Sequence, residues 1–164
     1  MHKQAACFLL VLLLFCLCTC SQKQYRDDIA CQSLAKDMCE KLPQKDGYAS
    51  FDQNYLSNLF VNQAIPDDFA LFYSVDASDI NEVFVFRASS IAKAETLRKL
   101  VLEYLKDKQE NDRAFIASYA PQELAKLDSA DVRQFGTYVI LCICPPDILE
   151  DCMETAKNAL IIKQ

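Results

Sequence analysis

The chain has 164 residues, carries 23 acidic and 17 basic residues for a formal net charge of −6, and contains one histidine and two glycines. This acidic balance disfavours nucleic acid as a partner, and two distant glycines, Gly47 and Gly136, exclude a glycine-rich phosphate loop. His2 lies in a segment that we expect to be removed, which excludes Ser-His and Cys-His catalysis and histidine-ligated metal sites from the rest of the chain.

Residues 1–19 have the pattern of a lipoprotein signal peptide. A weakly basic start with Lys3 precedes a nearly continuous apolar run over residues 5–19. Such a run matches the roughly 7–15 apolar residues of an export signal and is shorter than the ~20 residues that a membrane-spanning helix requires. We therefore predict export and cleavage.

Cys20 is the predicted lipidation site. Leu17 stands three positions before it and the small Thr19 directly before it, whereas Cys16 and Cys18 follow bulky residues. A diacylglyceryl group on the Cys20 thiol would hold the chain essentially permanently on the extracytoplasmic face of the cell membrane. Residues 20–26 then form the lipidated N-terminus and a tether, and residues 27–164 a single domain.

The first half of this domain is predicted to contain two helices and a hairpin. Apolar residues at helical spacing predict helices over residues 27–42 and 51–60, separated by a break at residues 43–47. Aromatic and β-branched residues predict strands over residues 69–75 and 83–86, joined by an acidic turn.

The second half is predicted to repeat this arrangement. A long helix begins at Ser89 or Ser90 and is interrupted near residues 109–113, and Pro121 opens a short helix. Residues 130–135 and 137–144 form a second hairpin around Gly136, followed by a final helix. The order α-α-β-β-α-β-β-α predicts an α+β fold with a four-stranded, mainly antiparallel sheet from two β-hairpins and helices packed on one face.

Five cysteines follow Cys20, and they favour buried thiols. The spacing opposes a bond between Cys31 and Cys39 on one helix, or between neighbours on the last strand. Longer-range disulfides and a thiolate metal site remain as alternatives, although no C-x-x-C pair occurs. The five are Cys31, Cys39, Cys142, Cys144 and Cys152.

Several segments resemble a family of small lipoproteins of Gram-positive bacteria, domain of unknown function 4358. They are the aromatic-rich residues 54–60, the Val-Phe-Val-Phe-Arg strand at 83–87, residues 118–127 and residues 136–141. The resemblance covers roughly residues 52–162. It implies a lipid anchor and an α+β fold, and it transfers no catalytic residue.

Three constellations suggest chemistry, and each has a structural alternative that we favour. Ser90 and Lys93 form an S-x-x-K motif, yet Ser90 also fits a helix N-cap. A turn with oxygen-bearing side chains could bind calcium, but solvated acidic turns are common. A set of aromatic residues could line a ligand pocket, but their spacing favours the core. The turn residues are Asp76, Asp79, Asn81 and Glu82, and the aromatic residues are Phe69, Phe72, Tyr73, Phe84, Phe86, Phe115, Tyr119 and Tyr138.

The sequence therefore predicts a non-catalytic, lipid-anchored cell-envelope protein that acts as an interaction or binding module. It predicts no catalytic residue, cofactor or metal ligand, and it predicts the membrane, through Cys20, and a cell-envelope protein as partners. The alternative is a small extracytoplasmic hydrolase or ligand-binding lipoprotein that uses serine and lysine or carboxylates.

Overall fold

An antiparallel five-stranded sheet forms the centre of the molecule in the computed structural model, which describes residues 24–43, 47–59 and 66–162. The predicted signal peptide and Cys20 lie outside these residues. The strand order is β1-β2-β3-β5-β4. The strands are β1 (Tyr48–Ser50), β2 (Asp68–Ser74), β3 (Glu82–Arg87), β4 (Asp131–Phe135) and β5 (Tyr138–Ile143). The predicted α+β class and the two hairpins are confirmed, but the sheet has five strands rather than four.

The strand that the sequence did not predict is β1. It has three residues and pairs with the edge of β2, with Tyr48 opposite Ser74. Gly47 precedes it with a φ of 89°, a left-handed conformation that glycine adopts without a steric penalty. Because three residues are too few to show an alternating pattern, only their pairing with β2 identifies the strand.

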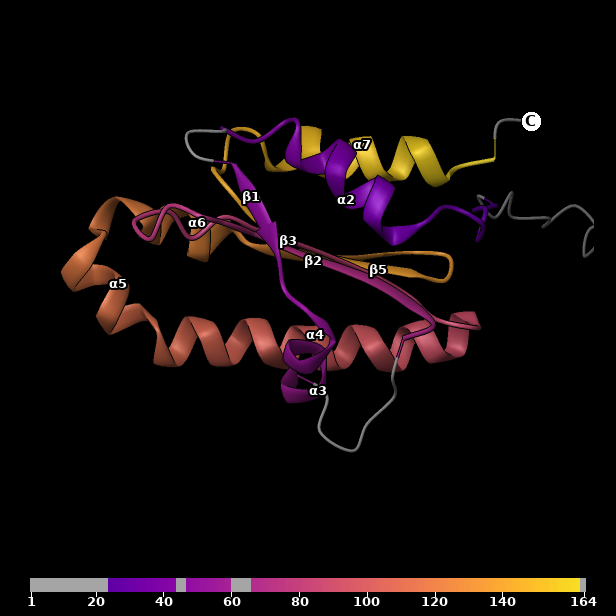
Figure 1. Cartoon of the computed structure of the whole chain (residues 1–164), viewed down its shortest axis with the longest axis horizontal. Coiled ribbons are helices and arrows are strands. Elements are labelled where there is room, and N and C mark those ends of the chain that lie inside the picture. Colours follow the sequence, from indigo (N-terminus) through magenta and orange to yellow (C-terminus); the bar gives the residue numbers. More distant parts are fainter. Residues whose placement is uncertain (1–23, 44–46, 60–65, 163–164) are drawn as a thin grey trace, which may run out of the picture.

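Helices cover both faces of the sheet, which corrects the prediction that they pack on one face (Figure 1). Helices α2 (Cys31–Cys39) and α7 (Leu149–Leu160) cover one face, while α3 (Gln53–Leu59) and α4 (Ile91–Asn111) cover the other. The reason lies in the interior strands, whose side chains are apolar on both sides and must be covered on both.

Alternate residues of β3 and β5 contribute to two separate cores. Val83 and Ile140 face α2 and α7, whereas Phe84 and Leu141 face α4, and all four are fully buried. The predicted interior position of the last strand is confirmed, because β5 lies between β3 and β4.

A chain of short helices links α4 to β4 at one end of the molecule. Helix α4 ends at Asn111, inside the polar stretch predicted to interrupt it, and α5 (Arg113–Tyr119), the 3₁₀ turn η1 (Pro121–Glu123) and α6 (Leu124–Ser129) follow. No helix in the described ranges is long and apolar enough to cross a bilayer.

The first described residues lie at the end of the molecule opposite α5 (Figure 1). The Arg26 N–H donates to the Leu160 carbonyl at 2.8 Å, the Ile162 N–H donates to the Gln24 carbonyl at 2.9 Å, and Tyr25 bridges to Ile161. The start of the described chain is therefore attached to the end of α7.

Candidate functional site

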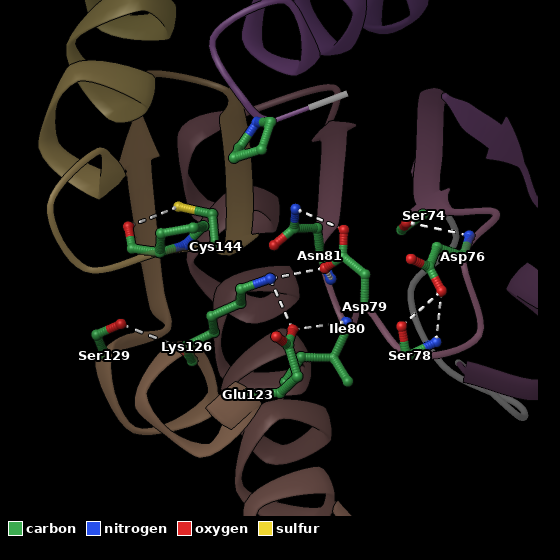
Figure 2. Close-up of polar contacts among 12 residues, drawn as sticks. Ser74, Asp76, Ser78, Asp79, Ile80, Asn81, Glu123, Lys126, Ser129 and Cys144 are labelled. Atoms are coloured by element: carbon green, nitrogen blue, oxygen red, sulfur yellow. Dashed lines mark hydrogen bonds and ion pairs between the residues drawn. The ribbon is translucent and has the colours of Figure 1, made fainter. Parts of the chain in front are cut away.

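A largely buried polar cluster lies where the β2–β3 turn meets η1 and α6 (Figure 2). The Lys126 ammonium donates to Asp79 Oδ1 at 2.7 Å and lies 2.6 Å from Glu123 Oε2. Glu123 also accepts the Ile80 backbone N–H at 3.3 Å. The three charged side chains are 10 to 18% exposed, so their charges are shielded from solvent.

Lys126 is held in its charged form. Burial lowers the pKa of Lys126, but hydrogen bonds to Asp79 and Glu123 more than offset this, and the pKa lies above its ordinary value. A general base or nucleophile needs a neutral amine near neutral pH, which requires a lowered pKa. The cluster therefore fastens the β2–β3 turn to α6 and does not activate the lysine.

Cys144, the residue directly after β5, lies at the border of this cluster (Figure 2). A hydrogen bond with Cys142 and the positive charge of Lys126 lower the pKa of the Cys144 thiol against the effect of burial. The side chain is nevertheless fully buried, and its thiol lies 3.6 Å from the Pro145 carbonyl oxygen, to which it donates. No substrate can reach the sulfur in this conformation.

The proposed calcium ligands do not converge. Asp76 accepts from the Ser78 N–H and hydroxyl, and Asp79 binds Lys126. Glu82 points toward α4, where its Oε1 lies 2.9 Å from Lys108 Nζ. In the described ranges, no group of three histidine, cysteine or acidic side chains could hold a metal ion.

The favoured alternative of a solvated turn is also wrong in part. Asn81 is 1% exposed, and its amide nitrogen donates to Tyr48 Oη and to Asp79 Oδ2, each at 3.0 Å. Glu82 is 7% exposed. Asn81 contacts Tyr48 of β1 and Glu82 contacts Lys108 of α4, and such contacts between distant segments are not visible in the local sequence.

The S-x-x-K motif is a helix cap, as we favoured. Ser90 Oγ accepts the backbone N–H of Lys93 at 3.2 Å at the first turn of α4. The Lys93 side chain is exposed, and neither Ser90 nor Lys93 lines the surface hollow between α4 and β4 that is described below. The motif therefore has a complete structural explanation.

The five described cysteines are buried thiols, and none of them forms a disulfide, which confirms the favoured interpretation. Cys142 and Cys152 lie close together, with 3.6 Å between their sulfur atoms. These two residues join β5 to α7 within the core.

The aromatic set divides into core and surface residues. Phe72, Phe84, Phe86 and Tyr138 are buried, in agreement with the favoured core position. Phe115 and Tyr119 are 64 and 76% exposed on α5, and their rings lie 4.5 Å apart. The eight residues line no common pocket in the described structure.

A hollow of the described surface lies between α4 and the edge strand β4. It is an open groove of about 1090 Å³. Its lining combines an exposed aliphatic residue with several charged ones, and it ends at the β4–β5 turn. The residues that define this groove, hereafter the β4 groove, are Ile91, Glu95, Arg98, Lys99, Asp131, Val132, Arg133, Gln134, Phe135, Gly136 and Tyr25.

The sequence did not point to this groove. Its α4 residues are one exposed aliphatic residue, Ile91, and three charged residues, Glu95, Arg98 and Lys99, and a mixed set of this kind does not mark a binding surface in the sequence. The groove forms because β4 is an edge strand and α4 packs beside it, a relationship that only the strand order reveals.

The fold and its polar clusters define a small α+β protein with helices on both faces of an antiparallel sheet. A comparison with known protein families matches residues 44–144 to the family described as Domain of unknown function (DUF4358). The chain belongs to this family. The match ends at Cys144, so α7 lies outside it. No curated protein and no solved structure matched the chain.

Proposed function

We propose that this protein is a lipid-anchored cell-envelope module that binds another protein and performs no catalysis. The signal-like residues 1–19 and Cys20 support the anchor and the extracytoplasmic location. The observation that carries the binding role is a contrast between the two sites. The candidate reactive groups are bound to other groups within the fold, whereas the β4 groove is open and runs along β4, whose outer edge pairs with no other strand in the described residues.

The polar cluster around Lys126 supports a structural rather than a catalytic role. Lys126 is fixed in its charged form by Asp79 and Glu123, and the Cys144 thiol beside it is buried. Ser90, the remaining nucleophile candidate, caps α4. Each of these groups has a partner that accounts for its position.

The anchor would also place the groove relative to the membrane. Four peptide units separate Cys20 from Gln24, and they span at most about 14 Å when fully extended. Since Tyr25 lines the β4 groove, a lipid on Cys20 would hold the groove close to the membrane surface. A partner in the envelope would then meet the groove near the membrane.

The test of the anchored location is fractionation of cells that produce the full chain. We expect the wild type in the membrane fraction and accessible to protease added outside the cells. Cys20→Ala should be released or left unprocessed, while Cys18→Ala, a change at a cysteine with bulky Leu17 before it, should behave as the wild type. Protease-resistant protein inside intact cells would contradict the proposed location.

The alternative is a small hydrolase or ligand-binding lipoprotein that uses Ser90, Lys93 or carboxylates. It is tested with purified full-length protein on ester, amide and glycoside substrates. Hydrolysis that disappears in Ser90→Ala or Lys93→Met, with the circular dichroism spectrum retained, would favour this alternative. No turnover by the wild type is the result that the binding role predicts.

A further inference from the structure

We propose that the β4 groove binds an extended, acidic segment of a partner protein, which adds to the sheet as a sixth strand beside β4. This inference deepens the proposed binding role and rests on it for the partner being a protein. It does not depend on the lipid anchor.

The direction of the β4 backbone groups follows from the neighbouring pairs. The Ala88 N–H donates to the Thr137 carbonyl, so the backbone groups of Thr137 face β3. Successive residues of a strand direct these groups to opposite sides, so Tyr138 faces β4 and bonds with its partner Phe135. The same alternation directs the backbone groups of Val132 and Gln134 away from β5, toward the open edge.

One of these outward groups is covered by the chain itself. The Val132 N–H donates to the carboxylate of the preceding Asp131 at 2.7 Å. The Val132 carbonyl and both backbone groups of Gln134 have no backbone partner in the described residues. An incoming strand can bond with these groups, and a sheet edge of this kind is the usual template for strand addition.

Helix α4 supplies the second wall of the groove. Ile91 is 59% exposed at the end near Gln134 and offers an apolar contact. Arg98 and Lys99 are exposed farther along the same wall. Side chains of an added strand would alternate between this wall and the opposite side of the sheet.

The charges indicate which side chains the partner presents. Arg133 is held by Asp131 and Glu150, with 2.6 Å between Arg133 Nη2 and Glu150 Oε2. Arg98 and Lys99 make no ion pair with any residue in the described ranges, and Glu95 is the acidic residue on their wall. Two unpaired cations on a chain of net charge −6 favour carboxylates at alternate positions of the added strand.

The probe for the test is a synthetic, fluorescently labelled peptide of about nine residues that alternates glutamate with valine or threonine. A peptide with lysine in place of each glutamate is its matched control. Fluorescence anisotropy with the purified full chain at low salt should show saturable binding of the glutamate peptide and much weaker binding of the lysine peptide. Hydrogen exchange should show new protection of the Gln134 N–H, the outward N–H of β4 that has no backbone partner in the described residues.

Two variants separate charge from backbone pairing. Arg98→Glu with Lys99→Glu should weaken binding of the glutamate peptide by roughly tenfold or more and strengthen binding of the lysine peptide. Lys93→Glu is the control, because Lys93 is exposed on the same helix but outside the groove. Gln134→Pro removes an outward N–H from the edge strand, where proline is tolerated, and should abolish binding with the fold retained.

Several results would overturn this assignment. One is no binding of the glutamate peptide up to about 1 mM. A second is binding of the glutamate peptide that is unchanged by Arg98→Glu with Lys99→Glu and by Gln134→Pro. A third is a dimer of this chain that Gln134→Pro dissociates, because a second copy would then occupy the β4 groove. Cleavage of the peptide would overturn the non-catalytic function as well, whereas absent binding would leave the anchor and the α+β module intact.

Discussion

Lys108, near the end of α4, forms an ion pair with Glu82 on the interior strand β3, with 2.9 Å between Lys108 Nζ and Glu82 Oε1. The two side chains are only 17 and 10% exposed, and Tyr104 Oη donates to the other oxygen of Glu82 at 3.0 Å. The pair joins the long helix to the sheet at the end where the acidic turn lies. In this largely buried pair, each charge is compensated by the other.

Loss of Lys108 should therefore destabilise the protein strongly. Removing one partner of a buried pair leaves an uncompensated charge, so Lys108→Met should lower the free energy of unfolding by about 3 kcal/mol. Lys106→Met is the matched control, because Lys106 and Glu110 are 73 and 64% exposed and their pair contributes less than about 0.5 kcal/mol. Urea unfolding of both variants measures the difference. Equal losses of unfolding free energy in Lys108→Met and Lys106→Met would contradict a buried pair between Lys108 and Glu82.

The buried thiol of Cys39 should make stability fall in alkaline solution. Burial, and secondarily Cys152, raise the pKa of Cys39 from 9.0 to about 12. The folded state therefore keeps its proton where the unfolded state loses it. The stability from this site is complete below pH 9.0 and is lost as pH rises toward about 12, by up to ~1.4 kcal/mol per pH unit.

Cys39→Ala measures this effect directly. Below pH 9.0 the variant should be less stable than the wild type, because it loses buried contacts. Above that pH the gap should narrow, because alanine does not titrate. Urea unfolding over this range tests the expectation, and a gap that stays constant with pH would contradict it.

Gly136 in the β4–β5 turn should not tolerate a side chain. Its φ is 60°, and an added Cβ would lie 2.9 Å from the Cβ of Tyr25. Gly136→Ala should therefore cost about 1–2 kcal/mol for the backbone conformation and more for the contact. Gly47→Ala is the control, since Gly47 has a φ of 89° but nothing within 4 Å. In thermal unfolding, Gly136→Ala should have a lower Tm than Gly47→Ala. The reverse order would contradict the close approach of Tyr25.

Ser90 should contribute stability as the cap of α4. Ser90→Ala removes an acceptor for the Lys93 N–H and should cost roughly 1 kcal/mol. Ser89→Ala is the neighbouring control, because the capping contact belongs to Ser90, and it should change stability by less than about 0.5 kcal/mol. If both changes had equal effects in chemical unfolding, the cap would be located wrongly.

The sequence predicts those parts of the fold in which the pattern is long enough to show a period. Residues 91–111 and the strand pairs were found because apolar residues recur over a turn or alternate over a strand. The apolar side chains on both faces of β5 already required helices on both sides, and the expectation of one covered face overlooked this requirement. The three residues of β1 could not be recognised, since their pairing is set by β2.

The sites were less accessible to sequence reasoning. Ser90 was understood because a helix cap is local, but Asp79 and Lys126 are 47 residues apart and meet only through tertiary packing. Lys108 occupies a position in the sequence at which the helical spacing of α4 expects an apolar, buried residue. This position was the indication that the lysine is buried. The β4 groove had no local sign, because an edge strand is defined by the absence of a neighbour.

The central claim, a chain anchored by lipid on Cys20, is tested most directly by the intact mass of the protein in the membrane fraction, with and without Cys20→Ala. We predict a mature wild-type chain that begins at Cys20 and carries a diacylglyceryl group, and a variant that loses both the cleavage and the lipid. A mature chain that begins at unmodified Ser21 or Gln22 would contradict the anchor.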